Sequence, residues 1–354
     1  MRTDEASGRI HGAAEALSVV RTRPRARRPA VGDYARALLA RHVDAGTWNA
    51  AGLPALPSRE NPVPVSGEAA VRLARLVVYL HCLDLPLAER PAVWERLEAF
   101  FADRLPTSAP ELVRLRLRAR YELLDAGRVS PGVIASLNEI LEFHRKVHGE
   151  DSYLAGLTRG DLSVAYRHSG DLARAAALID AEARTRTQRF GPYHPFTLVT
   201  RSNLARLLLL QAEAAEDQEH RHGFAQRALD IVNDIRPARD RRYGISAPDA
   251  TRSRRYEGHA LLLLGELDRA RACLEHALTF QRVHDGQQDS YTIGQTHLLL
   301  ARVYAARGNR SQAMDHAGRA WRILSAHLPD GTDCAQAADL ARELAAQPGA
   351  GQAR

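Results

Sequence analysis

The strongest constraint on the fold of this chain is an internal repeat. Residues 191–204 align with residues 149–162 at a shift of 42 residues, and the Asp-Ser-Tyr of residues 151–153 recurs at residues 289–291. Self-similarity at such a period indicates stacked supersecondary units, each of which buries its apolar face only against its neighbours. The sequence therefore predicts a repeat architecture built by stacking rather than one globular core.

Each unit is predicted to be a pair of helices joined by a tight turn. Alanine and leucine are plentiful and aromatic residues make up only 6% of the chain, a composition that favours helices. A helix commonly ends at a glycine in the left-handed conformation, and such residues recur about once per period. The longest interval contains residues 214–222, where we expect an insertion that lengthens a turn. The predicted turns are at Gly127, Gly170, Ala212, Gly265 and Gly308.

A longer motif marks the start of the central unit. Gly-x-x-His-Pro-x-Thr-Leu occupies residues 191–198, and Asn-Leu-Ala follows at residues 203–205. This pattern resembles the tetratricopeptide repeat, specifically the longer, kinesin-light-chain-like variety of about 42 residues that many bacterial regulators also contain. The resemblance covers residues 107–328. It implies an all-α fold, an α-solenoid of about five to six helical hairpins that forms a right-handed superhelix.

Small residues recur where this repeat needs close contact between helices. One set lies before the turns and a second set lies after them, at constant distances from each turn. The resemblance therefore predicts close helix packing at Ser163, Ala175, Ala205, Gly258, Ala270, Ala301 and Ala313.

The repeat pattern also sets the expected domain limits. A pair of apolar helices from Ser66 through Phe101 is expected to be a degenerate first repeat, because terminal repeats tend to be atypical. A last helix over residues 333–346 is expected to seal the other end, so the solenoid covers residues 66–346. The intervening units are predicted at residues 107–148, 149–190, 191–243, 246–285 and 288–328.

The regions outside the solenoid differ in composition. Residues 31–65 are expected to form a short helix over residues 32–48 and a proline-rich linker, one of which covers the apolar first repeat. Residues 1–30 include the arginine-rich stretch 21–29 and are expected to be a disordered basic arm, because they cannot bury enough apolar surface. The tail, residues 347–354, is expected to be disordered as well.

Charge and cysteine content limit the kinds of partner and the location. The chain has 49 basic and 42 acidic residues, a formal net charge of +7, and nearly all of the basic residues are arginine. The basic arm is therefore kept as an alternative contact for nucleic acid or an acidic partner. The cysteines are far apart, no stretch is apolar enough to span a membrane, and no signal peptide is evident. We expect a cytoplasmic protein without a membrane contact, and the sequence leaves its oligomeric state open.

The sequence contains none of the common catalytic signatures. It lacks a Walker lysine loop, a Gly-x-Ser-x-Gly elbow, a His-Glu-x-x-His motif and a Cys-x-x-Cys pair. His144 and His148 are predicted to lie on one face of a helix, but a metal site needs at least a third ligand, and none can be assigned. We therefore predict a non-enzymatic protein with no cofactor and no metal site.

The resemblance to the tetratricopeptide repeat also implies where a ligand binds. In this family the first helices of the hairpins line a concave groove, and the groove asparagine falls on Asn203. Arg206, Arg255 and Arg302 recur at corresponding or adjacent helix positions, and such a row can hold peptide carboxylates by charge-assisted hydrogen bonds. The alternative is that these arginines only keep an open groove hydrated. The predicted ligand-binding residues are Asp161, Arg167, Asn203, Arg206, Arg255, His259 and Arg302.

These features favour a scaffold whose groove binds a peptide or protein segment. One alternative is a transcriptional or signalling regulator that senses a ligand with its repeats and contacts nucleic acid or an acidic partner with the basic arm. Residues 1–65 show no convincing helix-turn-helix pair, which argues against that alternative. The other alternative is an accessory protein of a biosynthetic operon, with the same groove and a different partner.

Overall fold

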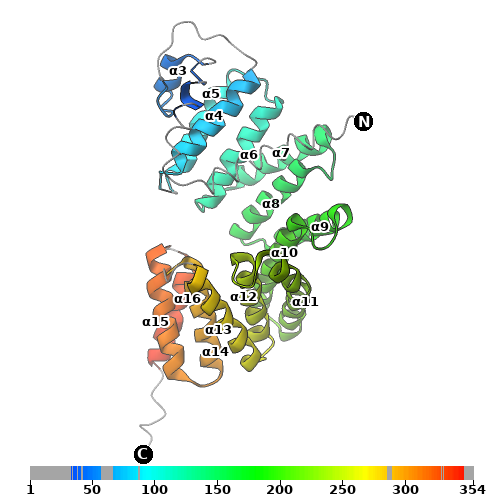
Figure 1. Ribbon diagram of the computed structural model, residues 1–354, viewed down its shortest axis with the longest axis vertical. Helices are drawn as coiled ribbons and strands as arrows, with labels where there is room; N and C mark the ends of the chain where they lie inside the picture. Colours follow the sequence, from blue (N-terminus) through cyan, green and yellow to red (C-terminus); the bar gives the residue numbers. More distant parts are fainter. Residues whose placement is uncertain are drawn as a thin grey trace, which may run out of the picture. The chain divides into compact units, whose positions relative to one another are not determined.

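The computed structural model shows a helical chain (Figure 1). It describes residues 33, 35–37, 39, 40, 43–56, 67–86, 88–284, 289–327, 329 and 331–346, and within them every regular element is a helix. The predicted basic arm, most of the proline-rich linker and the tail lie outside the described residues, as does Ser66, the predicted start of the first repeat. None of the described helices is both long and apolar enough to cross a bilayer.

The helices follow one another along the described parts of the chain. They are α3 (Ala45–Ala50), α4 (Gly67–Cys82), α5 (Arg90–Ala102), α6 (Pro110–Asp125), α7 (Pro131–His148), α8 (Tyr153–His168), α9 (Leu172–Phe190), α10 (Pro195–Ala214), α11 (Gln218–Tyr243), α12 (Pro248–Leu263), α13 (Leu267–His284), α14 (Tyr291–Ala306), α15 (Arg310–His327) and α16 (Thr332–Ala346).

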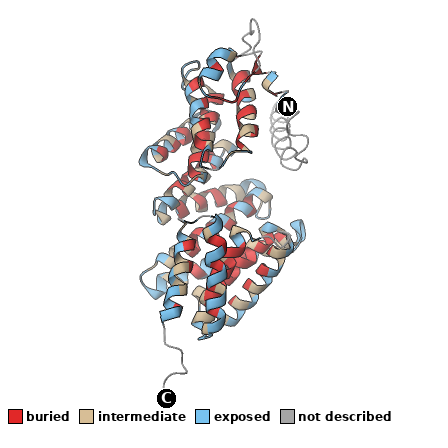
Figure 2. Cartoon of the chain, turned by 90° about the vertical axis from the view of Figure 1, so that its left-hand side faces the viewer, coloured by how far each residue is buried: buried red, intermediate tan, exposed pale blue. Residues whose placement is uncertain are grey.

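The chain divides into two compact units, residues 1–169 and residues 170–354, which we call unit 1 and unit 2. Within unit 1 each helix from α4 to α8 packs on the next, and α4 and α8 both contact α6. Within unit 2 each helix from α9 to α16 packs on the next, and α10, α12, α14 and α16 also contact one another in order. Buried residues lie on the helix faces that turn toward neighbouring helices (Figure 2). The predicted stacking of helical hairpins is thus confirmed, whereas the right-handed superhelix and the domain limits stay predictions.

The turns predicted at glycine residues are confirmed. Gly127, Gly170, Gly265 and Gly308 each follow a first helix and have φ values of 71°, 87°, 80° and 75°. This is the left-handed region, which glycine enters without the steric cost that a Cβ atom imposes. At each of these four positions the first helix therefore ends at a turn that the sequence identifies.

The turn predicted at Ala212 is wrong. Ala212 is fully buried inside α10, which continues to Ala214, and α11 begins at Gln218. The side chain of Asp217 accepts a hydrogen bond of 2.9 Å from the N–H of His220 and so caps α11 after a short turn. The additional residues are therefore taken up as helix, and α11 reaches 26 residues.

The small residues predicted at helix contacts are buried. These are Ser163, Ala175, Ala205, Gly258, Ala270, Ala301 and Ala313. A Cβ atom added to Gly258 would lie 2.6 Å from Cγ of Leu274, closer than atoms pack in protein interiors. α12 and α13 therefore approach each other at a point where only glycine fits without movement.

The apolar first repeat, α4 and α5, is covered by residues that precede it. Leu39 and Trp48 belong to the same buried cluster as Leu97 and Phe100. The Trp48 ring meets Phe100 edge-on with 5.2 Å between ring centroids, and its Nε1 donates a 2.8 Å hydrogen bond to the carbonyl of Pro54. The covering segment predicted for this repeat is therefore present, and it includes both helical and extended residues.

The short helix predicted over residues 32–48 is interrupted. Residue Asp44 is extended, and its carboxylate accepts a 2.7 Å hydrogen bond from the N–H of Thr47, which starts α3. A capping aspartate ends one helical stretch and begins another, because its side chain replaces a missing backbone partner.

The last helix, α16, closes the end of unit 2. Cys334 and Ala337 pack against Leu298 and Leu324, and Leu344 joins a second cluster formed by α14 and α15. A helix is present where the sequence predicts the last one, and it begins one residue before the predicted start.

Candidate functional site

The first helices of unit 2 carry a continuous row of polar side chains. α10 contacts α12, α12 contacts α14 and α14 contacts α16, so side chains on successive first helices can meet. We call this row the first-helix face of unit 2. Its residues are Asn203, Arg206 and Glu213 of α10, Arg255 and His259 of α12, Tyr291, Gln295 and Arg302 of α14, and Asp333 and Gln336 of α16.

The carboxylate of Glu213 is the centre of one network on this face. Its Oε1 accepts a 2.6 Å hydrogen bond from Nη1 of Arg302 and lies 3.0 Å from Nε2 of His259. Nη2 of Arg302 donates to Oε1 of Gln336 at 3.0 Å. Burial alone would raise the pKa of Glu213, but the hydrogen bonds and charges of His259 and Arg302 lower it to about 2. Side chains from α10, α12, α14 and α16 are thus tied together around one negative charge.

A second network on the same face begins at Arg255, which is only 7% exposed. Its Nη1 donates to Oε1 of Gln295, whose Nε2 donates a 2.6 Å hydrogen bond to Oδ2 of Asp333. The hydroxyl of Tyr291 donates to the same carboxylate oxygen at 2.8 Å. Burial lowers the pKa of Arg255, and the like charge of Arg206 close by also lowers it. The guanidinium of Arg255 is therefore held in a fixed position by neutral and acidic neighbours.

Arg206 and Asn203 stand beside this second network with their side chains uncommitted. Both are exposed, and neither forms a hydrogen bond or ion pair with any residue that the structure describes. The positive charge of Arg206 lowers the pKa of both Arg255 and Tyr291, so it lies within electrostatic range of both groups. Asn203 precedes Arg206 by about one helical turn on α10. A ligand can therefore engage these two side chains without breaking an existing contact.

Two of the predicted site residues, Asp161 and Arg167, lie on α8 in unit 1. Asp161 is half-buried, and burial raises the pKa of its carboxyl group to about 7, against the opposing charge of Arg118. Nη2 of Arg167 lies 2.8 Å from Nε2 of His168. Membership of these two residues in one ligand site with residues of unit 2 stays a prediction.

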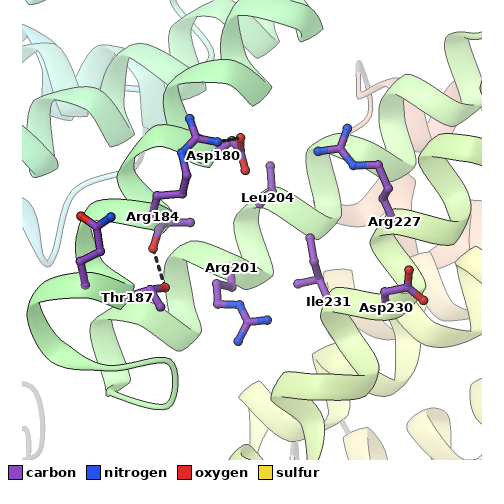
Figure 3. A pocket seen from close by; sticks show the side chains of 10 residues that line it. Asp180, Arg184, Thr187, Arg201, Leu204, Arg227, Asp230 and Ile231 are labelled. Carbon is purple, nitrogen blue, oxygen red and sulfur yellow. Dashed lines mark hydrogen bonds and ion pairs between the residues drawn. The ribbon is translucent and has the colours of Figure 1, made fainter.

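A groove of about 480 Å³ lies on unit 2 between α9 and α11, and residues of α10 line its floor (Figure 3). We call it the α9–α11 groove. Arg184 stands on one side and Arg227 on the other, with Leu204 and Ile231 between them (Figure 3). None of the predicted site residues lines this groove, so no sequence pattern pointed to it.

The chain matches no protein-family model and no curated protein. Among solved structures it aligns with a putative kinesin light chain of nearly identical TPR-like repeats from Podosopora anserina, at 16% identity and a TM-score of 0.48, over 62% of this chain and 97% of that one. It aligns with BtubC (BKLC) from P. vanneervenii at 22% identity and a TM-score of 0.49, over 69% and 92% of the two chains. A thermophilic TPR protein of Thermus thermophilus aligns at 19% identity and a TM-score of 0.45, over 64% and 98%.

The fold is a tetratricopeptide-like helical repeat. Its marks in this chain are the stacked hairpins, the left-handed glycine between their helices and the small residues at their contacts. The solved structures that align include proteins described as TPR proteins or as having TPR-like repeats. Similarity at this level concerns the fold and says nothing about activity.

The sequence analysis did not predict the side chains that accept hydrogen bonds from Arg255 and Arg302. Glu213 lies in the additional turn of α10, so the long interval between predicted turns was the one signal that pointed to its region. Gln295, Asp333 and Gln336 have no local signal, because each contacts a partner more than 30 residues away in the sequence. Only the stacking of first helices brings these residues together.

Packing explains His144 of the predicted histidine pair, whereas His148 is exposed. His144 is fully buried, and its Nδ1 lies 3.0 Å from Oγ1 of Thr158. Burial lowers the pKa of His144 to about 4. In the part of the chain that the structure describes, no three histidine, cysteine, aspartate or glutamate residues are grouped so that they could hold a metal ion.

Proposed function

We propose that this chain is a non-enzymatic interaction scaffold whose first-helix face in unit 2 binds a peptide or protein segment. The observation that carries this proposal is the state of Arg206 and Asn203, which are exposed and uncommitted next to a row of charged groups already fixed by hydrogen bonds. The guanidinium of Arg255 is already held by Gln295, and binding to such a prepositioned side chain costs less conformational entropy than binding to a mobile one.

Charge favours a ligand group with negative character at this position. Burial lowers the pKa of Arg255, and the like charge of Arg206 lowers it further. A carboxylate or a row of backbone carbonyls from a bound segment would relieve the repulsion and accept charge-assisted hydrogen bonds. Asn203 can both donate to and accept from the backbone of that segment.

The network around Glu213 restricts where the segment lies. Glu213 already engages Arg302 and His259, so these two side chains are not free for a ligand near Glu213. The uncommitted donors lie toward Asn203 and Arg206 instead. The proposed ligand therefore binds around Asn203, Arg206 and Arg255, while His259 and Arg302 hold the helices in position.

The proposal is tested with the full chain and a displayed library of random peptides. Peptides that bind are remade, and their dissociation constants are measured by fluorescence anisotropy. The double variant Asn203→Ala, Arg206→Ala should weaken the bound peptides by about tenfold or more, the loss expected when a charge-assisted hydrogen bond is removed.

A matched control separates this effect from a general loss of charge. Arg319→Ala removes an exposed arginine that pairs with Asp315 on α15. It should leave the dissociation constants unchanged. Peptides that bind the Asn203/Arg206 double variant as tightly as they bind the unaltered chain would rule out this face as the site.

A further inference from the structure

The α9–α11 groove combines an apolar floor with cationic walls. We propose that it is a second docking site, and that it holds a partner segment that carries acidic side chains beside apolar ones. Ala183 and Leu204 are each 5% exposed and form part of the lining together with half-buried Ile231. Because Ala183 is small, no side chain from α9 fills the space above Leu204. The volume of about 480 Å³ falls within the range typical of ligand sites, about 300–1,000 Å³.

Three arginines surround this floor, and they differ in whether they already form an ion pair and how exposed that pair is. Arg201 is paired with Asp234 at 2.6 Å. Arg184 pairs with Asp180 one turn away on α9, and both groups are at least one-third exposed. Such an exposed pair within one helix contributes only about 0.3–0.5 kcal/mol, so a second carboxylate can share Arg184 at little cost.

Arg227 is the third arginine of the groove, and its side chain is available to a ligand. It is exposed, and it forms no hydrogen bond or ion pair with any residue in the part of the chain that the structure describes. The nearby carboxylate of Asp230 accepts a 2.8 Å hydrogen bond from Gln226 instead. Arg184 and Arg227 stand on opposite sides of the groove (Figure 3), so an acidic side chain lying over Leu204 meets a cation from each wall.

The lining favours a protein segment over a nucleic acid or an anionic membrane. The apolar floor gains nothing from a phosphate backbone, whereas it removes apolar side chains from water. Asp180 and Asp230 on the two walls repel a uniformly anionic partner. A segment with one or two acidic residues among apolar ones satisfies both the floor and the arginines.

This groove lies apart from the first-helix face. Arg201 and Leu204 project from α10 on the side roughly opposite Asn203 and Arg206, because about 3.6 residues make one helical turn. A segment in the groove therefore does not compete with a segment on the first-helix face. The second site stands on its own observations and does not depend on the first.

The test uses the full chain and the same kind of displayed random-peptide library, now sorted by which variant abolishes binding. We expect a class of peptides enriched in acidic and apolar residues. Their dissociation constants should rise by about tenfold in each of the single variants Arg184→Ala and Arg227→Ala. The dissociation constants should rise further in Arg227→Glu, whereas Arg227→Lys should retain most of the binding. Their binding should weaken with added salt, because the contacts are charged.

Two controls make the result decisive. The Asn203→Ala, Arg206→Ala variant should bind these peptides normally, and helicity by circular dichroism should be unchanged in all groove variants because the altered side chains are exposed. The proposal is overturned if no acidic and apolar class is enriched. It is equally overturned if that class binds the Arg184/Arg227 variants normally or loses binding only in the Asn203/Arg206 variant.

Discussion

Among single residues, Glu213 shows how one side chain organises a surface. Its carboxylate accepts from Arg302 and lies against His259, and Arg302 in turn donates to Gln336. An ion pair that joins residues 89 positions apart fixes the spacing of helices that are not neighbours in the sequence. This charge is partly buried, so removing it leaves Arg302 and His259 without their shared acceptor.

We expect Glu213→Gln to lower the free energy of unfolding by about 1–3 kcal/mol at pH 7, the range for hydrogen bonds to charged groups. The folded-state pKa of about 2 lies below the ordinary value of 4.5, so the contribution is present above pH 4.5 and is lost as pH falls toward 2. Urea unfolding followed by circular dichroism should therefore show a difference from the unaltered chain that shrinks as the pH is lowered from about 5 to about 3.

The control for this prediction is Glu216→Gln, which removes an exposed glutamate just beyond α10. It should change the free energy of unfolding by less than about 0.5 kcal/mol, as surface substitutions usually do. A destabilisation by Glu213→Gln that persists undiminished at about pH 3 would show that the carboxylate charge is not its cause.

Among the helices, spacing is set by a few close contacts and buried polar anchors. Arg239 of α11 is fully buried, and its guanidinium donates to Oγ of Ser202 on α10 and Oγ of Ser253 on α12, at 3.0 Å and 2.9 Å. It also donates to the carbonyl of Leu198 at 3.0 Å. One arginine thereby joins three helices, a role that its position in an otherwise polar helix does not reveal.

The close approach of α12 and α13 at Gly258 predicts that replacement of two different glycines by alanine changes the free energy of unfolding in opposite directions. Gly258→Ala should lower the free energy of unfolding by about 1–2 kcal/mol, because the new methyl group overlaps Leu274 and overpacking outweighs the better helix propensity of alanine. Gly223→Ala in α11, where a Cβ atom meets nothing within 4 Å, should raise it by about 0.5–1 kcal/mol.

Both variants are measured by urea unfolding at one pH. The pair is matched, because each change adds one methyl group inside a helix. Equal effects of the two changes would contradict the contact argument.

In the molecule as a whole, each of the two units contains a buried histidine that resists protonation. His144 in unit 1 lies against Thr158, and Nδ1 of His297 in unit 2 lies 2.9 Å from Nδ1 of His316. Burial lowers the pKa of His144 to about 4 and that of His297 to about 3. The neighbouring His148 acts on the first in the same direction, and His316 acts on the second.

We therefore expect both units to lose stability as the pH falls below 6.5, the ordinary pKa of histidine. The unfolded chain binds a proton at each histidine below that value, whereas the folded chain stays neutral there until about pH 4 or lower. His144→Gln should reduce the slope of the free energy of unfolding against pH between about pH 6.5 and about pH 4.5. The reduction should be at most the slope that uptake of about one proton contributes. Tryptophan fluorescence reports chiefly on unit 1, because Trp48 and Trp94 are buried there whereas Trp321 of unit 2 is 50% exposed.

Asn138→Ala is the control, because Asn138 is exposed on α7 of the same unit and carries no titratable group. This variant should leave the slope of the free energy of unfolding against pH unchanged. A slope that is the same in His144→Gln as in the unaltered chain would show that His144 is protonated in the folded state.

The repeat could be recognised from local sequence alone. The period, the glycine turns and the small residues at contacts are local properties, because φ at a turn and the room for a Cβ atom depend on a residue and its nearest neighbours. The turn predictions were confirmed at Gly127, Gly170, Gly265 and Gly308. The capping helix α16 was also recognisable from its polar face.

Which polar groups meet, by contrast, depends on the stacking of the helices. The extra residues near 214–222 became helix instead of a longer turn, since Asp217 caps α11, and this carried Glu213 to Arg302. The three arginines predicted to form one row differ in their hydrogen-bond partners for the same reason. Arg302 is neutralised, Arg255 is held by Gln295, and Arg206 is left uncommitted. Such pairings join helices tens of residues apart, and no local pattern encodes that distance.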